Sequence, residues 1–173
     1  MFLNYIKDFF LKRILKNSLH NVKSSTLGTP IKTVGVLVDE SYFFEKDNLV
    51  SELIANGIHE NNIKVIAYSG KLKKNEIYSH PTFGVKNINW KAEITDSEVN
   101  NFINEKFDLL ISYYDIEKAI LLTVTHNSKA FFKVGFSSID KRLNHLMINT
   151  NAENYKVFAH ELFRYLRILN KIE

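Results

Sequence analysis

The stretch from residue 107 to residue 136, FDLLISYYDIEKAILLTVTHNSKAFFKVGF, constrains the fold more than any other part of the chain. Its ends, LLISYY (109–114) and AFFKVGF (130–136), are mostly apolar at consecutive positions, as strands are when both faces of a parallel sheet are covered. Residues 116–125 are apolar nearly all round and predict a buried helix that Asp115 caps. Strand, helix and strand in this order form a βαβ unit, which indicates an α/β fold.

The rest of the chain repeats this alternation. Further strands are predicted at residues 31–38, 63–68 and 146–148, with a short one near Val85–Ile88. Further helices are indicated by Asp47 as a cap with Gly57 near the end, and by the capping boxes Thr95–Glu98 and Thr150–Glu153. The sequence therefore predicts a single three-layer Rossmann-like α/β domain over residues 31–173. Its mainly parallel sheet is expected to bring together the strands near 33–38, 63–68, 108–113 and 130–135.

Residues 1–23 are predicted to form an amphipathic basic helix, joined to the domain by a linker over residues 24–30. This segment has five basic residues and one acidic residue, which accounts for the formal net charge of +4, whereas the remainder holds eighteen of each sign. The balanced remainder argues against a broad nucleic-acid-binding surface. Three interpretations of the helix stay open: docking on its own domain, contact with an anionic membrane, or contact with a protein or RNA partner. The residues predicted for membrane or partner contact are Lys7, Lys12, Arg13 and Lys16.

Residue types and spacings exclude several kinds of chemistry. The chain has no cysteine, which excludes disulfides, thiolate zinc sites and cysteine nucleophiles. It has neither a GxGxxG motif nor a P-loop, and HELFR (160–164) has Arg164 where a zinc protease needs its second histidine, so no metal and no cofactor are predicted. No uncharged run approaches the ~20 residues of a membrane span. Charged residues also interrupt the apolar N-terminus, so the expectation is a cytoplasmic protein, with peripheral contact at the inner membrane surface as an option.

Polar side chains follow the buried strands at the carboxyl ends, where open α/β sheets bind ligands in a crevice. The candidates are Asp39 and Glu40 after the first strand, Ser69 after the second, and Tyr113, Tyr114 and Asp115 after the fourth. Carboxylates and phenols together bind a sugar or a ribose through hydrogen bonds and stacking. The alternative is structural: Asp115 caps the next helix, the tyrosines pack over the sheet edge, and residues 113–115 are only a turn.

Five segments extend over nearly the whole chain: VGVLVDE (34–40), FDLLISYY (107–114), SKAFFKVGF (128–136), DKRLNHLMINTN (140–151) and YLRILNKI (165–172). They resemble an uncharacterised family of short α/β proteins, a domain-of-unknown-function family typical of Bacteroidota. This resemblance implies the fold class and no particular reaction. Residues 107–136 also show a weaker, local resemblance to the N-terminal domain of heptosyltransferase-type glycosyltransferases. Those enzymes bind their nucleotide-sugar donor largely in a second Rossmann domain.

These patterns favour a non-enzymatic module that binds a partner or a small ligand. The alternative is a glycosyltransferase-like or nucleotide-handling enzyme that uses the crevice near Asp39 and residues 113–115. For a small ligand, both interpretations predict binding at the same edge of the sheet, where the parallel strands end.

Overall fold

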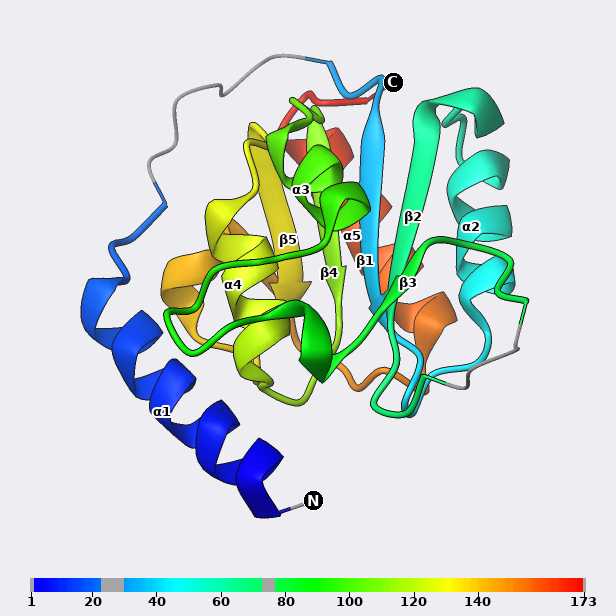
Figure 1. Cartoon of the computed structure of the whole chain (residues 1–173). Helices are drawn as coiled ribbons and strands as arrows, with labels where there is room; N and C mark the ends of the chain where they lie inside the picture. Colours follow the sequence, from blue (N-terminus) through cyan, green and yellow to red (C-terminus); the bar gives the residue numbers. More distant parts are fainter. Residues whose placement is uncertain (1, 23–29, 73–76, 173) are drawn as a thin grey trace.

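The described part of the chain forms one open sheet of six parallel strands with helices on both faces (Figure 1). The computed structural model describes residues 2–22, 30–72 and 77–172. The strands are β1 (Val34–Asp39), β2 (Ile63–Tyr68), β3 (Thr82–Phe83), β4 (Leu109–Tyr113), β5 (Phe132–Phe136) and β6 (Leu146–Ile148). Their order is β3-β2-β1-β4-β5-β6, and each neighbouring pair is parallel. The predicted Rossmann-like α/β fold is confirmed, and nearly all of the predicted linker (24–30) lies outside the described residues.

The four central strands are those with the plainest sequence signal. β1, β4 and β5 are buried along their whole length, because helices cover both faces of the sheet. Val34 of β1 is in register with Ile63 of β2 on one side and with Leu109 of β4 on the other. The strands that the sequence predicts to be neighbours are therefore neighbours.

The helices form the outer layers. α2 (Lys46–Ala55) and α5 (Tyr155–Ile168) pack together on one face of the sheet, and α3 (Ser97–Asn104) and α4 (Ala119–Asn127) pack on the other (Figure 1). α1 (Phe2–Ser18) lies against the outside of α4 and adds a further layer there. The crossover from β1 thus runs through α2 on one face, while the crossover from β4 runs through α4 on the other.

A stripe of leucines fixes α1 to the body of the protein. Leu11, Leu15 and Leu19 recur every four residues and are all buried. Burying one leucine side chain stabilises a protein by about 1.5–3 kcal/mol, so the stripe holds the helix firmly. The helix thus docks on its own domain, which is one of the three interpretations left open by the sequence. Its outward face remains exposed and includes Phe9, Phe10, Arg13 and Ile14.

The prediction of a short strand near Val85–Ile88 is wrong. Residues Val85–Asn87 form a 3₁₀ turn instead, and the edge strand β3 lies just before it. The Asn87 side-chain oxygen accepts the Gly84 N–H at 2.8 Å, and the Asn87 N–H donates back to the Gly84 carbonyl at 2.9 Å. An asparagine that binds the backbone of its own turn competes with strand pairing. Ile88 then makes only an isolated antiparallel bridge with Ile94.

Two predicted capping boxes are also wrong. The N-cap of α3 is Asp96 rather than Thr95, and its carboxylate accepts the N–H groups of Glu98 and Val99 at 3.0 and 3.2 Å. A carboxylate is a stronger acceptor than a hydroxyl at a helix N-terminus, where the dipole is positive. α5 begins after Asn154, one residue beyond the predicted Thr150–Glu153 box.

Of the three remaining predictions of helix ends, two are wrong and one is confirmed. Asp47 lies inside the first turn of α2, because the helix starts one residue earlier, after Glu45. α4 starts at Ala119 rather than at residue 116, so Asp115 does not cap it. The predicted end of α2 is confirmed: Gly57 has φ +96°, a left-handed conformation that glycine adopts without strain.

Candidate functional site

The strand order creates a crevice between β1 and β4. These two strands are adjacent, yet the chain leaves β1 toward one face of the sheet and leaves β4 toward the other. The turns that follow them therefore diverge at the carboxyl edge. This is the topological switch point at which open α/β sheets bind ligands.

A largely buried ion pair spans this switch point. Asp39, the last residue of β1, is only 4% exposed. One of its carboxylate oxygens accepts the Ser41 N–H at 2.9 Å, and the other accepts the ammonium of Lys118. Lys118 is the residue immediately before α4. The pair therefore ties the turn after β1 to the turn after β4.

Two tyrosine rings flank the ammonium of Lys118. Its nitrogen lies 4.7 Å from the ring centroid of Tyr42 and 4.6 Å from that of Tyr68, so both contacts are of the cation–π type. The two rings differ in exposure: Tyr42 is 63% exposed, whereas Tyr68, the last residue of β2, is 4% exposed. Burial, and secondarily the nearby Asp39 carboxylate, raise the pKa of Tyr68 to about 12. Its hydroxyl therefore stays protonated at neutral pH and is available as a hydrogen-bond donor.

Two adjoining hollows share these residues. The outer hollow, about 460 Å³, opens beside Ser41, Ser69 and Lys71. The inner hollow, about 420 Å³, lies between α1 and the sheet edge and is lined by Lys7, Asp8 and the first turn of α4. The residues common to both are Tyr42, Tyr68, Gly70 and Lys118. We refer to the two hollows together as the switch-point crevice.

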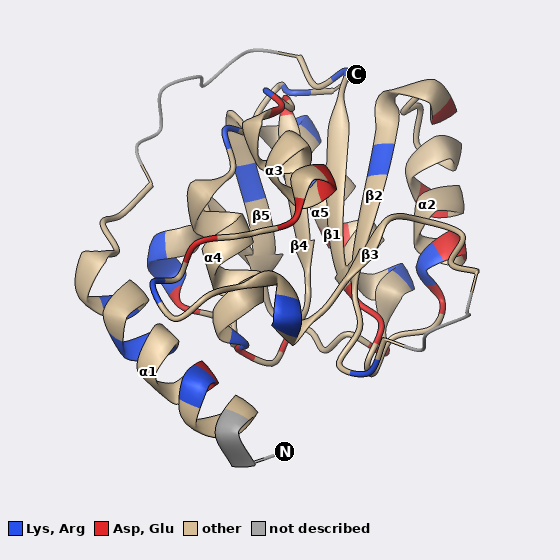
Figure 2. Cartoon of the chain, in the orientation of Figure 1, with Lys and Arg blue, Asp and Glu red and all other residues tan. Residues whose placement is uncertain are grey.

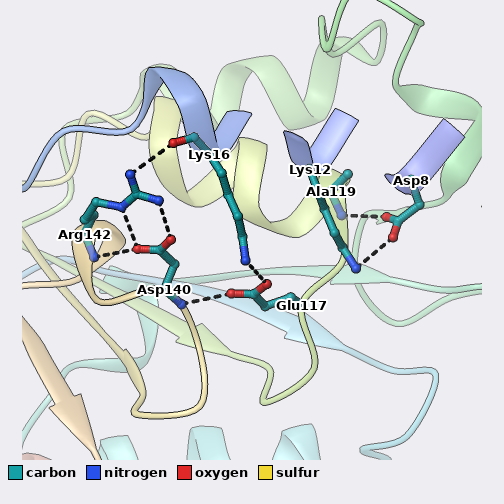
Figure 3. Close-up of polar contacts among 7 residues, drawn as sticks. All are labelled: Asp8, Lys12, Lys16, Glu117, Ala119, Asp140 and Arg142. Atoms are coloured by element: carbon teal, nitrogen blue, oxygen red, sulfur yellow. Dashed lines mark hydrogen bonds and ion pairs between the residues drawn. The ribbon is translucent and has the colours of Figure 1, made fainter. Parts of the chain in front are cut away.

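Three polar side chains of α1, those of Asp8, Lys12 and Lys16, lie on the side of the helix that faces the body (Figure 3). Asp8 accepts the Ala119 N–H, the first of α4, at 2.7 Å and pairs with Lys12 at 2.8 Å. Lys16 pairs with Glu117 at 2.6 Å. Arg142 donates to the Lys16 carbonyl at 3.0 Å while it binds Asp140, and this guanidinium lowers the pKa of the Asp140 carboxyl to about 2.

The sequence profile of a protein family described as Family of unknown function (DUF6913) matches residues 7–169. The chain belongs to this family. No curated protein and no solved structure matches the chain. The family match confirms the predicted membership of a domain-of-unknown-function family and does not extend to an activity.

Two of the predicted site residues lie at the crevice. Asp39 forms its central ion pair, and Ser69 lines the outer hollow, where its hydroxyl donates to the Lys71 carbonyl at 3.3 Å. Glu40 lines neither hollow and pairs instead with Lys46, the first residue of α2. Ligand binding by these residues stays a prediction.

The side chains of residues 113–115, the predicted turn, form hydrogen bonds with other segments of the protein. The buried Tyr113 hydroxyl donates to the Ala152 carbonyl at 2.7 Å, and the Asp115 carboxylate accepts the Ala152 N–H at 2.9 Å. The Tyr114 hydroxyl is buried beside the Thr125 hydroxyl at 2.8 Å. Burial raises the pKa of both phenols. These contacts join β4 to α4 and to the loop before α5.

Three residues of the crevice were missed by the sequence reasoning: Tyr42, Tyr68 and Lys118. Tyr68 is the last residue of a correctly predicted strand, so the rule that located Asp39 applied to it as well. Tyr42 follows Asp39 in the next turn. No local sequence pattern marks Lys118 as a site residue, because only the order of the strands brings it next to Asp39.

The predicted basic contact residues are mostly engaged with the chain itself. Lys7 donates to the Ile88 carbonyl and lies over the Trp90 ring, while Lys12 and Lys16 form the ion pairs described above. Arg13 is exposed on the outward face. Figure 2 shows the basic residues along α1 beside the body. Membrane or partner contact through this segment stays a prediction.

A further hollow lies outside the switch-point crevice. A hollow of about 580 Å³ lies between β6 and α5, and its walls include Phe132, Leu146, Ile168 and Leu169. It lies away from the switch point, so the candidate site is placed at the crevice.

Within residues 2–22, 30–72 and 77–172, no cluster of three or more histidine or acidic side chains suits a metal ion. No helix in those ranges has the length and apolar character that crossing a bilayer requires.

Proposed function

We propose that this DUF6913 protein is a ligand-binding module, whose switch-point crevice takes a small hydroxylated molecule such as a sugar or a ribose. The observation that carries the proposal is the Asp39–Lys118 ion pair, which spans the switch point beneath an exposed tyrosine ring. Charged side chains and an exposed aromatic ring at one concave site are the features that ligand pockets combine.

Tyr42 supplies the stacking face. Its ring is 63% exposed on the rim of both hollows, and the Lys118 ammonium lies 4.7 Å from its centroid. An aromatic ring packs against the apolar C–H face of a sugar or against a base. The cation beneath the ring favours one orientation and so reduces the entropy lost when a ligand binds.

Lys118 supplies hydrogen bonds to hydroxyl groups. Its ammonium lines both hollows and has three donors, so it retains capacity beyond its contact with Asp39, which lines neither hollow. The protonated Tyr68 hydroxyl adds a donor at the wall that the two hollows share. The hydroxyl oxygens of a polyol accept hydrogen bonds, which matches these donors.

The same arrangement favours binding over catalysis. General base catalysis requires an acceptor that takes a proton near neutral pH. Asp39 is held by Lys118 and by the Ser41 N–H, and the raised pKa of Tyr68 keeps its hydroxyl protonated. The crevice thus offers positioned hydrogen bonds rather than a group prepared to abstract a proton.

The test is calorimetric titration of the full chain with ribose, hexoses, nucleosides and nucleotide sugars. For any ligand that binds, Tyr42→Ala is expected to weaken the affinity about tenfold, because stacking is lost. The matched control is Phe44→Ala, which removes an exposed ring from the same turn; Phe44 is absent from the walls of both hollows. Equal affinity of both variants, or no binding by any compound, would refute the proposal.

An enzymatic role in the same crevice gives a different result in the same experiment. A glycosyltransferase-like or nucleotide-handling enzyme consumes the nucleotide sugar, which proton NMR of the mixture detects over several hours. Consumption that depends on Lys118 and Asp39 would favour the enzyme over the binding module.

A further inference from the structure

The N-terminus of α4 receives its anion from another helix. The residue before α4 is Lys118, whose side chain has no acceptor and forms no cap. The first N–H of α4, that of Ala119, is instead bound by the Asp8 carboxylate of α1 at 2.7 Å. Asp8 is the single acidic residue among residues 2–18. A helix N-terminus carries partial positive charge, so a carboxylate from a distant part of the chain occupies a position suited to an anion.

The wall of the inner hollow contains an unused hydrogen-bond donor. Tyr68 is more than nine-tenths buried and lines this hollow, yet its hydroxyl makes no hydrogen bond with any residue that the structure describes. The hydroxyl oxygen itself is not fully enclosed, since the fully buried side-chain atoms without a partner in the described residues belong to Asn144, so Tyr68 presents a donor to whatever occupies the hollow. Because the phenol is protonated, the group that satisfies it is an acceptor.

Cations complete the surroundings of the hollow. Lys118 and Lys7 line it, and Lys12 pairs with Asp8 at 2.8 Å. Apart from the two carboxylates already engaged, Asp8 and Asp39, the polar groups that meet here include ammonium ions, a phenol and the N-terminus of α4. Donors and positive charge at one point suit a phosphate or carboxylate group.

We infer that the ligand of the crevice is a sugar phosphate, and that its phosphate replaces the Asp8 carboxylate at the N-terminus of α4. This inference rests on the proposed function: the sugar lies in the outer hollow beside Tyr42, and the phosphate enters the inner hollow beside Tyr68. Asp8 is then an internal competitor, whose carboxylate occupies the phosphate position in the free protein and lowers the affinity for the ligand.

The exchange needs only a side-chain movement. Leu11, Leu15 and Leu19 are buried along α1, so lifting the whole helix would expose an apolar stripe. Asp8 lies one turn before Leu11, the first leucine of the stripe, and is already paired with Lys12 on its own helix. Its carboxylate can rotate away from Ala119 and keep that partner. The phosphate therefore competes with Asp8 while α1 stays docked.

The experiment compares ribose 5-phosphate, ribose and inorganic phosphate by calorimetric titration of the full chain. The test variant is Asp8→Asn, which keeps an oxygen that accepts the Ala119 N–H and removes the negative charge. It is expected to bind ribose 5-phosphate about tenfold more tightly than the wild type, with no change for ribose. The control is Asp96→Asn, the same change at the N-terminus of α3, which should leave both affinities unchanged.

A second variant keeps the inference testable if Asp8→Asn does not fold. Tyr68→Phe removes only the unpartnered hydroxyl, and it should lower the ratio of ribose 5-phosphate affinity to ribose affinity roughly tenfold, since a bond to a charged acceptor is lost. Inorganic phosphate should bind more weakly than ribose 5-phosphate.

Each contrary outcome has a distinct meaning. Ribose that binds with no gain from its phosphate, or unchanged affinities in both variants, would overturn this inference and leave the proposed function standing. Inorganic phosphate that binds as tightly as ribose 5-phosphate would overturn the assignment of a sugar phosphate. The absence of binding by ribose and ribose 5-phosphate alike would remove both proposals.

Discussion

Lys118 and Asp39 lie 79 residues apart in the sequence and form a largely buried ion pair where β1 and β4 separate. The pair lies at the junction of the sheet where the crossover from β1 and the crossover from β4 go to opposite faces. It has two consequences: it stabilises the turns around the crevice, and it places opposite charges at the ligand position. The first consequence can be measured without knowing the ligand.

Lys118→Met is expected to destabilise the protein by about 3 kcal/mol, because the Asp39 carboxylate stays buried without its cation. The double variant Asp39→Asn, Lys118→Met should recover part of this loss, since no uncompensated charge remains. Urea denaturation followed by circular dichroism measures both changes. As a control, Lys64→Met removes a pair with Glu105 that is largely exposed, and it should cost at most about 1 kcal/mol. Equal losses for Lys118→Met and Lys64→Met would contradict the buried character of the pair.

Local patterns were sufficient for the central strands. Residues 34–39, 109–113 and 132–136 are mostly apolar and are buried over their whole length, and such runs have few other stable arrangements than a covered parallel sheet. The edge strand β3, at Thr82–Phe83, is too short to have a period, so it could not be predicted. The neighbouring Asn87 decided the conformation there through hydrogen bonds to its own turn.

The candidate site was only partly predictable, because its contacts are distant in sequence. Asp115 has the spacing of a local cap, yet its carboxylate binds the N–H of Ala152, 37 residues away. The N-terminus of α4 is bound by Asp8, 111 residues away. A local pattern identifies which side chains can accept a hydrogen bond and leaves open which donor lies beside them.

The docking of α1 can be tested at the centre of its leucine stripe. Leu15→Ala should destabilise the protein by about 2–5 kcal/mol, because a cavity forms between α1 and the body. Ile14→Ala is the matched control: the side chain is half-exposed on the outward face, so a change within about 0.5 kcal/mol is expected. Thermal unfolding of both variants decides the matter. If Leu15→Ala has no larger effect than Ile14→Ala, α1 is not part of the core.

The outward face of α1 keeps a membrane surface as a possible partner. Phe9 and Phe10 are 58% and 52% exposed beside Arg13, and aromatic residues with a cation suit an anionic lipid surface. Because Lys7, Lys12 and Lys16 are engaged with the body, the attraction should be weak and sensitive to salt, on the order of 1 kcal/mol per free cation.

Co-sedimentation with vesicles of anionic and neutral phospholipid measures this contact. We expect the full chain to sediment with anionic vesicles at low salt, and Phe9→Ala, Phe10→Ala to reduce the bound fraction. Phe44→Ala, which removes an exposed ring elsewhere, should behave like the wild type. No binding at low salt, or equal binding by all variants, would leave membrane contact without support.

A buried lysine on β5 should make stability depend on pH. The Lys133 ammonium donates to the Thr125 and His126 carbonyls at the end of α4, at 2.7 and 3.2 Å. Burial, with a smaller contribution from Lys129, lowers the pKa of Lys133 from 10.5 to about 8. In the unfolded chain the pKa returns to its ordinary value, so between about pH 8 and 10.5 the unfolded state binds more protons.

The sign follows from proton linkage: where the unfolded state binds more protons, the free energy of unfolding rises with pH. The cost of burying the charged ammonium is therefore largest below pH 8 and is relieved as the pH approaches 9.5. Relative to Lys133→Met, which has no titrating group at this position, the wild type should gain about 1–2 kcal/mol between pH 7 and pH 9.5. Urea denaturation of both proteins at the two pH values gives this difference. Lys106→Met, a change at an exposed lysine, should show no such gain, and a wild type that loses stability relative to Lys133→Met over this interval would refute the assignment.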